Sequence, residues 1–147
     1  MKVEMIYDKT IKEDKVVIYS ANSNSNINIL YNIIKEYNEI KQIIGYLNNE
    51  IYLIEKDDIE RFYTENGKIY ADVNSNKYLI KNKLYKIEEL LKNTSFVRIS
   101  YYEITNFNKV EKLNLENGST ICLKYKSGTI TYVSRRYIKK IKDYLKI

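Results

Sequence analysis

The sequence predicts a mainly β protein, α+β overall, in which an elongated antiparallel β domain carries small helices. Many short runs of alternating apolar and polar residues favour strands, and they are separated by tight Asn- and Gly-containing turns. Only three segments show the helical spacing of apolar residues, and strands do not alternate regularly with helices as in a βαβ protein. No repeat of solenoid length is present.

The first 45 residues are expected to form a small ββα extension. Lys2–Tyr7 and Val16–Tyr19 have strand-like patterns, and Ser23 or Ser25 is a candidate N-cap for a following helix. The apolar face of that helix is Ile27, Leu30, Tyr31, Ile34 and Tyr37. We assign residues 1–45 to this extension and residues 46–147 to the β domain.

The middle of the chain contains the strongest hairpin signal. Asn66-Gly67 lies between strand-like runs at Ile59–Tyr63 and Lys68–Val73, and a type I′ turn requires positive φ at both central residues. Asn48-Asn49 and Asn74-Ser75-Asn76 are further predicted turns. A helix is predicted next by the stripe of Leu84, Ile87, Leu90 and Leu91.

The last third is predicted to be strands followed by a terminal helix. The expected strands are Phe96–Ser100, Val110–Leu115, Thr120–Tyr125 and Thr129–Val133, with a turn at Asn117-Gly118 and an irregular segment at Tyr101–Phe107. Ser134 is the predicted N-cap of the helix, whose apolar stripe is Ile138, Ile141 and Leu145.

Composition argues against several classes of protein. The chain has no histidine and one cysteine, Cys122, so neither an intrachain disulfide nor a zinc cage is expected, and a reducing cytoplasm fits. No apolar run approaches the roughly 20 residues that span a bilayer, and the N-terminus lacks the apolar core of a signal peptide. The sequence has no glycine-rich phosphate loop, and Asp57-Asp58 is better explained as a turn than as a catalytic pair. We therefore expect no enzyme, no cofactor and no metal.

Positive charge is concentrated at the C-terminal end. Residues 96–147 hold 11 basic and 4 acidic residues, a net charge of +7, whereas residues 46–95 hold 8 basic and 9 acidic residues. The protein has only four arginines, and Arg135 and Arg136 are adjacent at the predicted start of the terminal helix. Anions bind helix N-termini, and two guanidinium groups beside one would make this corner attractive to phosphate.

Three loop regions could form one binding surface. They are the Asn66-Gly67-Lys68 turn, the Ser100–Asn108 loop and the Ser134-Arg135-Arg136 corner. Asn can read adenine, Arg can read guanine, and Lys can neutralise phosphate. Simpler explanations remain open, because Asn106 could be a left-handed turn residue and Arg135 could form an ion pair with Glu103 or Glu111.

The order of several motifs resembles the LytTR DNA-binding domain of bacterial transcription regulators. The motifs are Asp58-Ile59-x-x-Phe62, the Asn-Gly-Lys hairpin, Leu84-x-x-Ile87-Glu88-x-x-Leu91, Phe96-Val97-Arg98-Ile99-Ser100, Ile104-x-Asn106, Val110, Gly128 and Val133-Ser134-Arg135-Arg136-Tyr137-x-Lys139. The resemblance covers roughly residues 46–147. The head of the chain resembles the ββα extension of small LytTR proteins that lack a receiver domain.

This resemblance implies an antiparallel β fold whose loops enter successive major grooves of promoter DNA. The candidate contacts are Arg135, Arg136, Asn106, Lys68, Asn66, Ser100, Tyr101, Tyr102 and Lys139. The chain departs from the family at Tyr101 and Tyr102, where a basic residue and a serine are usual, and at Thr105, where an aliphatic residue is usual. The lost cation should weaken phosphate attraction, although a tyrosine hydroxyl can still bond a phosphate.

The sequence therefore predicts a cytoplasmic, sequence-specific regulator of transcription that binds double-stranded promoter DNA. A homodimer on DNA is left open, and no membrane insertion is expected. The alternative is a protein-interaction module that keeps the β scaffold but has lost DNA binding, with the Tyr101–Phe107 loop as its contact patch, since tyrosine favours interfaces.

Overall fold

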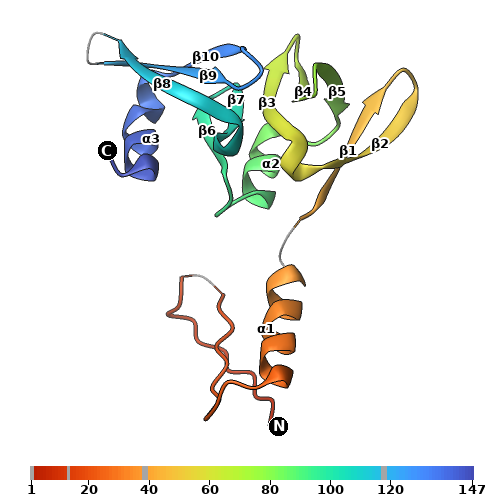
Figure 1. The fold of residues 1–147 in the computed structure, drawn as a ribbon, viewed down its shortest axis with the longest axis vertical. Helices are drawn as coiled ribbons and strands as arrows, with labels where there is room; N and C mark the ends of the chain where they lie inside the picture. The colour runs from red at the N-terminus through yellow and green to blue at the C-terminus, as the bar shows by residue number, and fades with distance from the viewer. Residues whose placement is uncertain (1, 13, 38–39, 117–118) are drawn as a thin grey trace. The chain divides into compact units, whose positions relative to one another are not determined.

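The chain forms two compact units, which we describe separately. The structure is a computed structural model that describes residues 2–12, 14–37, 40–116 and 119–147. Residues 1–39 form the first unit and residues 40–147 the second (Figure 1). No helix in these described ranges is long and apolar enough to cross a membrane.

Among its described residues, 2–12 and 14–37, the first unit contains one regular element, helix α1 (Ser25–Tyr37). Its cap is Asn24, whose side-chain Oδ1 accepts a hydrogen bond from the Ile27 amide at 3.0 Å, so neither predicted serine caps the helix. The two strands expected at Lys2–Tyr7 and Val16–Tyr19 are not present. Val3 is 89% exposed, as expected for a segment without an apolar surface to cover, and an isolated hairpin is marginally stable in water.

The second unit is built on a seven-stranded antiparallel sheet (Figure 1). Its strand order is β2-β1-β5-β4-β3-β7-β6. The strands are β1 (Gln42–Leu47), β2 (Glu50–Glu55), β3 (Ile59–Glu65), β4 (Lys68–Val73), β5 (Asn76–Ile80), β6 (Phe96–Ser100) and β7 (Glu103–Asn106). Strand β1 starts within the range that we assigned to the extension, because its residues pair with β2 and β5 of this sheet.

Tight turns set the strand register as predicted. Asn66 and Gly67 both have positive φ, 50° and 76°, and join β3 to β4. Asn48 and Asn49 (φ 51° and 66°) do the same between β1 and β2. Residues Lys56–Asp58, which include the predicted Asp57-Asp58 turn, form the 3₁₀ turn η1.

One face of the large sheet packs against helix α2 (Leu84–Leu90). The predicted stripe of this helix supplies Leu84 and Ile87 to the core, together with Leu91 directly after its last residue. These side chains lie in one cluster with Phe62 and Phe96, whose ring centroids are 5.7 Å apart. Burying this apolar stripe fixes the helix on the sheet.

A second sheet and helix complete the unit. Its strands, in the order β10-β9-β8, are β8 (Val110–Glu116), β9 (Thr120–Tyr125) and β10 (Ile130–Val133). The turn predicted at Asn117-Gly118 lies outside the described residues. Helix α3 (Ile138–Leu145) places Ile141 in a second core with Ile99 and Leu123.

The segment predicted to be irregular, Tyr101–Phe107, is mostly regular. It contains a two-residue turn and then strand β7, which lies between β3 and β6 and is buried at all four positions. Phe107–Lys109 then form the 3₁₀ turn η2. The polar residues Glu103 and Thr105 interrupt the apolar pattern of the strand, which explains why a strand was not predicted here.

Candidate nucleic-acid interface

The turn between β6 and β7 presents two aromatic side chains. Tyr101 and Tyr102 are 71% and 61% exposed, and their rings meet edge to face at 5.0 Å. The Ser100 hydroxyl accepts a hydrogen bond from the Tyr102 amide at 3.1 Å, so Ser100 shapes this turn. The Thr64 amide of β3 donates to the Tyr102 carbonyl at 2.9 Å. The turn is therefore held to the neighbouring strand while its rings face solvent.

Arg98 stabilises the same turn through hydrogen bonds to its backbone. Its Nε donates to the Ser100 carbonyl at 3.1 Å, and its Nη2 donates to the Tyr101 carbonyl at 2.6 Å. Its Nη1 lies 3.6 Å from Glu88 of α2, and the Arg98 side chain is only 11% exposed. This arginine is thus committed to the fold.

The Arg135-Arg136 corner is a 3₁₀ turn, η3 (Arg135–Tyr137), directly before α3. Ser134 occupies the N-cap position of η3, but its side chain makes no capping hydrogen bond, and the N-cap of α3 is Tyr137, so the predicted side-chain cap of the terminal helix is not formed. The Ser134 backbone is used instead. Its amide bonds the Ile99 carbonyl at 3.0 Å, and its carbonyl accepts from the Tyr137 amide at 2.9 Å. A backbone bond to β6 does not require a particular side chain, and the 3₁₀ turn gives the chain a tighter entry into α3.

The cations of this corner face solvent. Arg135, Arg136 and Lys139 are exposed, and none of them has an ion pair within the described parts of the chain. The alternative of an ion pair between Arg135 and Glu103 or Glu111 is not realised, because Glu103 bonds Arg61 and Glu111 lies 3.9 Å from Lys124. Free guanidinium groups can bind an external anion bidentately.

The β3–β4 hairpin reaches the same turn from the other side. Asn66 and Lys68 are exposed at the hairpin end. Lys68 lines one groove with Tyr101 and Tyr102. The Tyr101-Tyr102 turn and Lys68 therefore line the same groove. Ser134 lies close to the start of this turn because its amide bonds the carbonyl of Ile99. In this way the fold brings Lys68 of the first predicted loop region and the Ser134 end of the third close to the Tyr101-Tyr102 part of the second.

Asn106 lies elsewhere and has a different role. It is 1% exposed and pairs with Phe96, at the end of β7 away from the tyrosines. Its Nδ2 donates to the Ile59 carbonyl at 2.8 Å, and its Oδ1 accepts from the Ser95 hydroxyl at 2.8 Å and from the Asn108 amide at 3.1 Å. A direct base contact by Asn106 does not fit this geometry, and its φ of −84° is not left-handed either.

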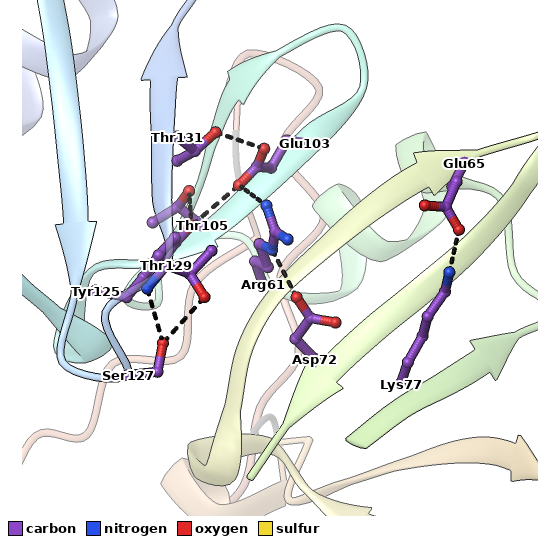
Figure 2. A network of polar contacts seen from close by, with 10 residues as sticks. All are labelled: Arg61, Glu65, Asp72, Lys77, Glu103, Thr105, Tyr125, Ser127, Thr129 and Thr131. Atoms are coloured by element: carbon purple, nitrogen blue, oxygen red, sulfur yellow. Dashed lines mark hydrogen bonds and ion pairs between the residues drawn. The ribbon is translucent and has the colours of Figure 1, made fainter. Parts of the chain in front are cut away.

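Glu103, the first residue of β7, links the two sheets (Figure 2). Its Oε1 accepts from Arg61 of β3 at 3.4 Å and from the Tyr125 hydroxyl of β9 at 3.1 Å. Its Oε2 accepts from the Thr131 hydroxyl of β10 at 2.8 Å. Glu103 directly follows Tyr102, so the tyrosine turn is also anchored to the second sheet.

Two further residues complete this network. Asp72 of β4 accepts from Arg61 Nε at 2.7 Å, and the hydroxyl groups of Thr105 and Tyr125 lie 2.7 Å apart. Burial alone would lower the pKa of Arg61, but the Asp72 hydrogen bond and the two carboxylates raise it overall. Burial, followed by the negative charge of Glu103, raises the pKa of Tyr125. The arginine therefore stays charged and the tyrosine neutral at pH 7.

The sequence did not predict the hydrogen-bond network of Glu103. It also did not predict the side formed by Lys81, Lys83 and Tyr85 in the groove that Lys68 lines with the two tyrosines. Glu103 and Thr105 were expected in a loop, and Lys81, Lys83 and Tyr85 were not considered as surface candidates. The Lys81-Asn82-Lys83 sequence was the available signal for the wall, since it places two cations between a strand and a helix. No local sequence signal pointed to the partners of Glu103, which come from three distant strands.

Comparison with known proteins agrees with this architecture. The family model of the LytTr DNA-binding domain matches residues 49–146. A solved structure from Bacillus cereus, named as a LytTr DNA-binding domain, aligns with a TM-score of 0.71 at 19% identity, over 74% of this chain and 100% of that chain. At this identity the structural match supports the fold.

Relatives that align with all 147 residues of this chain are found in Staphylococcus aureus. A protein of strain NCTC 8325 / PS 47 is 32% identical over 147 residues, covering 100% of this chain and 99% of its own. A protein of strain N315 is 31% identical over the same coverage. Both are named as uncharacterized HTH-type transcriptional regulators. In the described parts of this chain, however, strands separate α1, α2 and α3, so no helix-turn-helix is formed. The family match and the β architecture together show that the chain belongs to the LytTR family of DNA-binding domains.

Proposed function

We propose that this protein is a cytoplasmic transcription regulator that binds double-stranded promoter DNA in a sequence-specific manner. The observation that carries the proposal is the hydrogen bond from the Ser134 amide to the Ile99 carbonyl, which ties the segment before Arg135 to the end of strand β6 just before Tyr101. This bond fixes the Arg135-Arg136 corner beside the Tyr101-Tyr102 turn. A fixed spacing between loops is what recognition of bases at defined positions requires.

The contacts in this proposal follow from exposure and chemistry. Arg135 and Arg136 reach base edges or phosphates in the major groove, and Lys139 neutralises phosphate. Tyr101 and Tyr102 contact the backbone through their hydroxyl groups, and Ser100 orients them. Lys68, supported by Asn66 at its turn, anchors the opposite end of the surface.

Two features support a regulatory role. The relatives from Staphylococcus aureus that match over their whole length are named as transcriptional regulators. The excess positive charge of residues 96–147, net +7, attracts a polyanion to the end of the chain that carries the arginines. A homodimer on the duplex remains a prediction, which the stoichiometry of binding checks.

The direct test is a fluorescence titration of the protein against a labelled duplex from its own promoter region. We expect binding that weakens steeply as salt rises, because each neutralised phosphate releases counterions. An unrelated duplex of equal length measures non-specific binding. Absence of binding at low salt, or binding that salt does not affect, would overturn the proposal.

A second candidate function rests on the exposure of Tyr101 and Tyr102, 71% and 61%. Paired exposed aromatic rings are typical of the centre of protein interfaces. In this case the chain would be a protein-interaction module. A stable complex with a protein partner that requires both tyrosines, without any binding to DNA, would favour this alternative.

A further inference from the structure

A cationic groove of about 630 Å³ lies beside the tyrosine turn. Its walls come from the β3–β4 hairpin, the segment between β5 and α2, and the β6–β7 turn. Of the residues that line it, Lys68, Lys81, Lys83 and Arg98 are basic and none is acidic.

This separation of charge departs from the local composition. Residues 46–95 contain 9 acidic and 8 basic residues, yet the groove takes three lysines and no acidic residue from this part of the chain. Two carboxylates of the neighbouring β3 and β4 are engaged elsewhere, since Glu65 pairs with Lys77 and Asp72 pairs with Arg61. Within the described residues, Arg98 is paired with Glu88 of α2, whereas Lys68, Lys81 and Lys83 have no ion pair and give the groove a net positive field.

Two of these cations are available to a ligand. Lys68 and Lys83 are exposed and have no ion pair within the described residues. The ammonium group of Lys81 lies 4.1 Å from the Tyr46 ring centroid, an exposed contact that is weak enough to exchange for a phosphate. Arg98 binds the backbone of the tyrosine turn and pairs with Glu88 at 3.6 Å, so it is not counted as a ligand contact.

Aromatic groups complete the rim. Tyr85 is 56% exposed on the α2 side, opposite Tyr101 and Tyr102 on the turn side. The groove lining also contains apolar residues, among them Ile69 and Leu84. Tyrosine hydroxyls flanking lysine ammonium groups are donors that suit phosphate oxygens.

We propose that this groove holds the phosphate backbone of bound duplex DNA, with Lys83 and Lys81 as contacts. The inference rests on the proposed function and extends it. The surface then continues from the Arg135-Arg136 corner, past the Tyr101-Tyr102 turn, to the segment from Lys81 to Tyr85. Contacts to phosphate carry no sequence information, so this wall raises affinity for every duplex alike.

The test compares Lys83→Gln and the double variant Lys81→Gln/Lys83→Gln with the wild-type protein. Lys92→Gln is the matched control, because Lys92 is an exposed lysine just beyond the other end of α2. Binding to the promoter duplex and to an unrelated duplex is titrated between about 50 and 200 mM salt. Circular dichroism confirms that each variant is folded.

We expect Lys83→Gln to weaken binding to both duplexes by the same factor. The slope of log affinity against log salt should flatten by about 0.9 for each lost phosphate contact, so by nearly twice that in the double variant. Lys92→Gln should match the wild type. The inference is overturned if the wild type binds DNA and the double variant has the affinity and slope of Lys92→Gln.

Other outcomes are equally distinct. If the wild type fails to bind any duplex, the proposed function itself fails, and the inference fails with it. Calorimetric titration with ATP tests whether the groove takes a free nucleotide instead. Binding of ATP that is lost in the double variant, with unchanged DNA affinity, would overturn the assignment to duplex DNA.

Discussion

The backbone amide of Ser134 donates a hydrogen bond to the carbonyl of Ile99 at 3.0 Å. This bond joins residues 35 positions apart in the chain. Ser134 is the residue directly before the Arg135-Arg136 corner, and Ile99 is two residues before Tyr101. Both loops are therefore held by the same point of strand β6, with the core residues Ile99 and Ile141 packed in one cluster behind them.

The first prediction concerns the two arginines. Arg135→Ala and Arg136→Ala are each compared with Lys112→Ala, which removes an exposed cation from β8. If an arginine reads a base, its replacement should weaken the free energy of binding to the promoter duplex by about 1–3 kcal/mol. It should also relax sequence specificity at one position of the site. An arginine that binds phosphate should weaken all duplexes alike. Fluorescence anisotropy measures both effects, and unchanged affinity would remove that arginine from the interface.

The second prediction concerns Tyr101, where the family usually has a basic residue. Tyr101→Arg adds a cation next to the groove and should strengthen binding to any duplex, with a steeper salt dependence by about 0.9. Tyr101→Gln is the neutral control, since it removes the ring without adding charge. If both variants weaken binding equally, the aromatic ring and not the charge determines affinity at this position.

The third prediction concerns Asn106. Asn106→Ala removes the buried partner of the Ile59 carbonyl and the part-buried acceptor of the Asn108 amide. We expect a loss of about 1–3 kcal/mol in the free energy of unfolding, measured by urea denaturation. DNA affinity of the folded variant should stay close to wild type. A large loss of affinity in a protein of unchanged stability would restore Asn106 as a DNA contact.

The fourth prediction concerns alkaline pH. Burial and the charge of Glu103 raise the pKa of Tyr125 in the folded state above its unfolded value. The stabilisation is therefore complete below about pH 10 and is lost as pH rises further, because the unfolded chain releases this proton first. The free energy of unfolding should fall by up to about 1.4 kcal/mol per pH unit from this group.

Tyr125→Phe removes this titration, so its stability should fall less steeply above about pH 10. Tyr101→Phe, which removes the hydroxyl of an exposed ring, is the control and should keep the wild-type slope. Urea denaturation at a series of pH values gives the slopes. Identical slopes for Tyr125→Phe and the wild type would contradict the burial of a neutral tyrosine beside Glu103.

Local rules predicted the parts of the fold that depend on neighbouring residues. The Asn66-Gly67 turn follows from backbone sterics, and the Leu84–Ile87 stripe follows from helical spacing. The same rules failed at Val3, because alternation produces a strand only where another surface covers it. The side chains of Val3 in Lys2–Tyr7 and of Tyr19 in Val16–Tyr19 are exposed, so no such surface covers them.

The remaining features of the fold depend on contacts between residues that are far apart in the sequence. Glu103 and Thr105 resemble loop residues until Arg61 and Tyr125 are placed beside them. Asn106 resembles a surface residue until its amide meets the Ile59 carbonyl, 47 residues away. For the candidate interface, the sequence indicated the three loops, but only the fold showed which side chains remain free.

Selection of binding sites from a pool of random duplexes tests the central claim most directly. The account predicts that the wild-type protein enriches one sequence motif, whereas a protein with both Arg135→Ala and Arg136→Ala enriches none or a less defined motif. The selected duplex should bind with a steep salt dependence. Recovery of a pool with the composition of the input, by a folded wild-type protein at low salt, would contradict sequence-specific DNA binding.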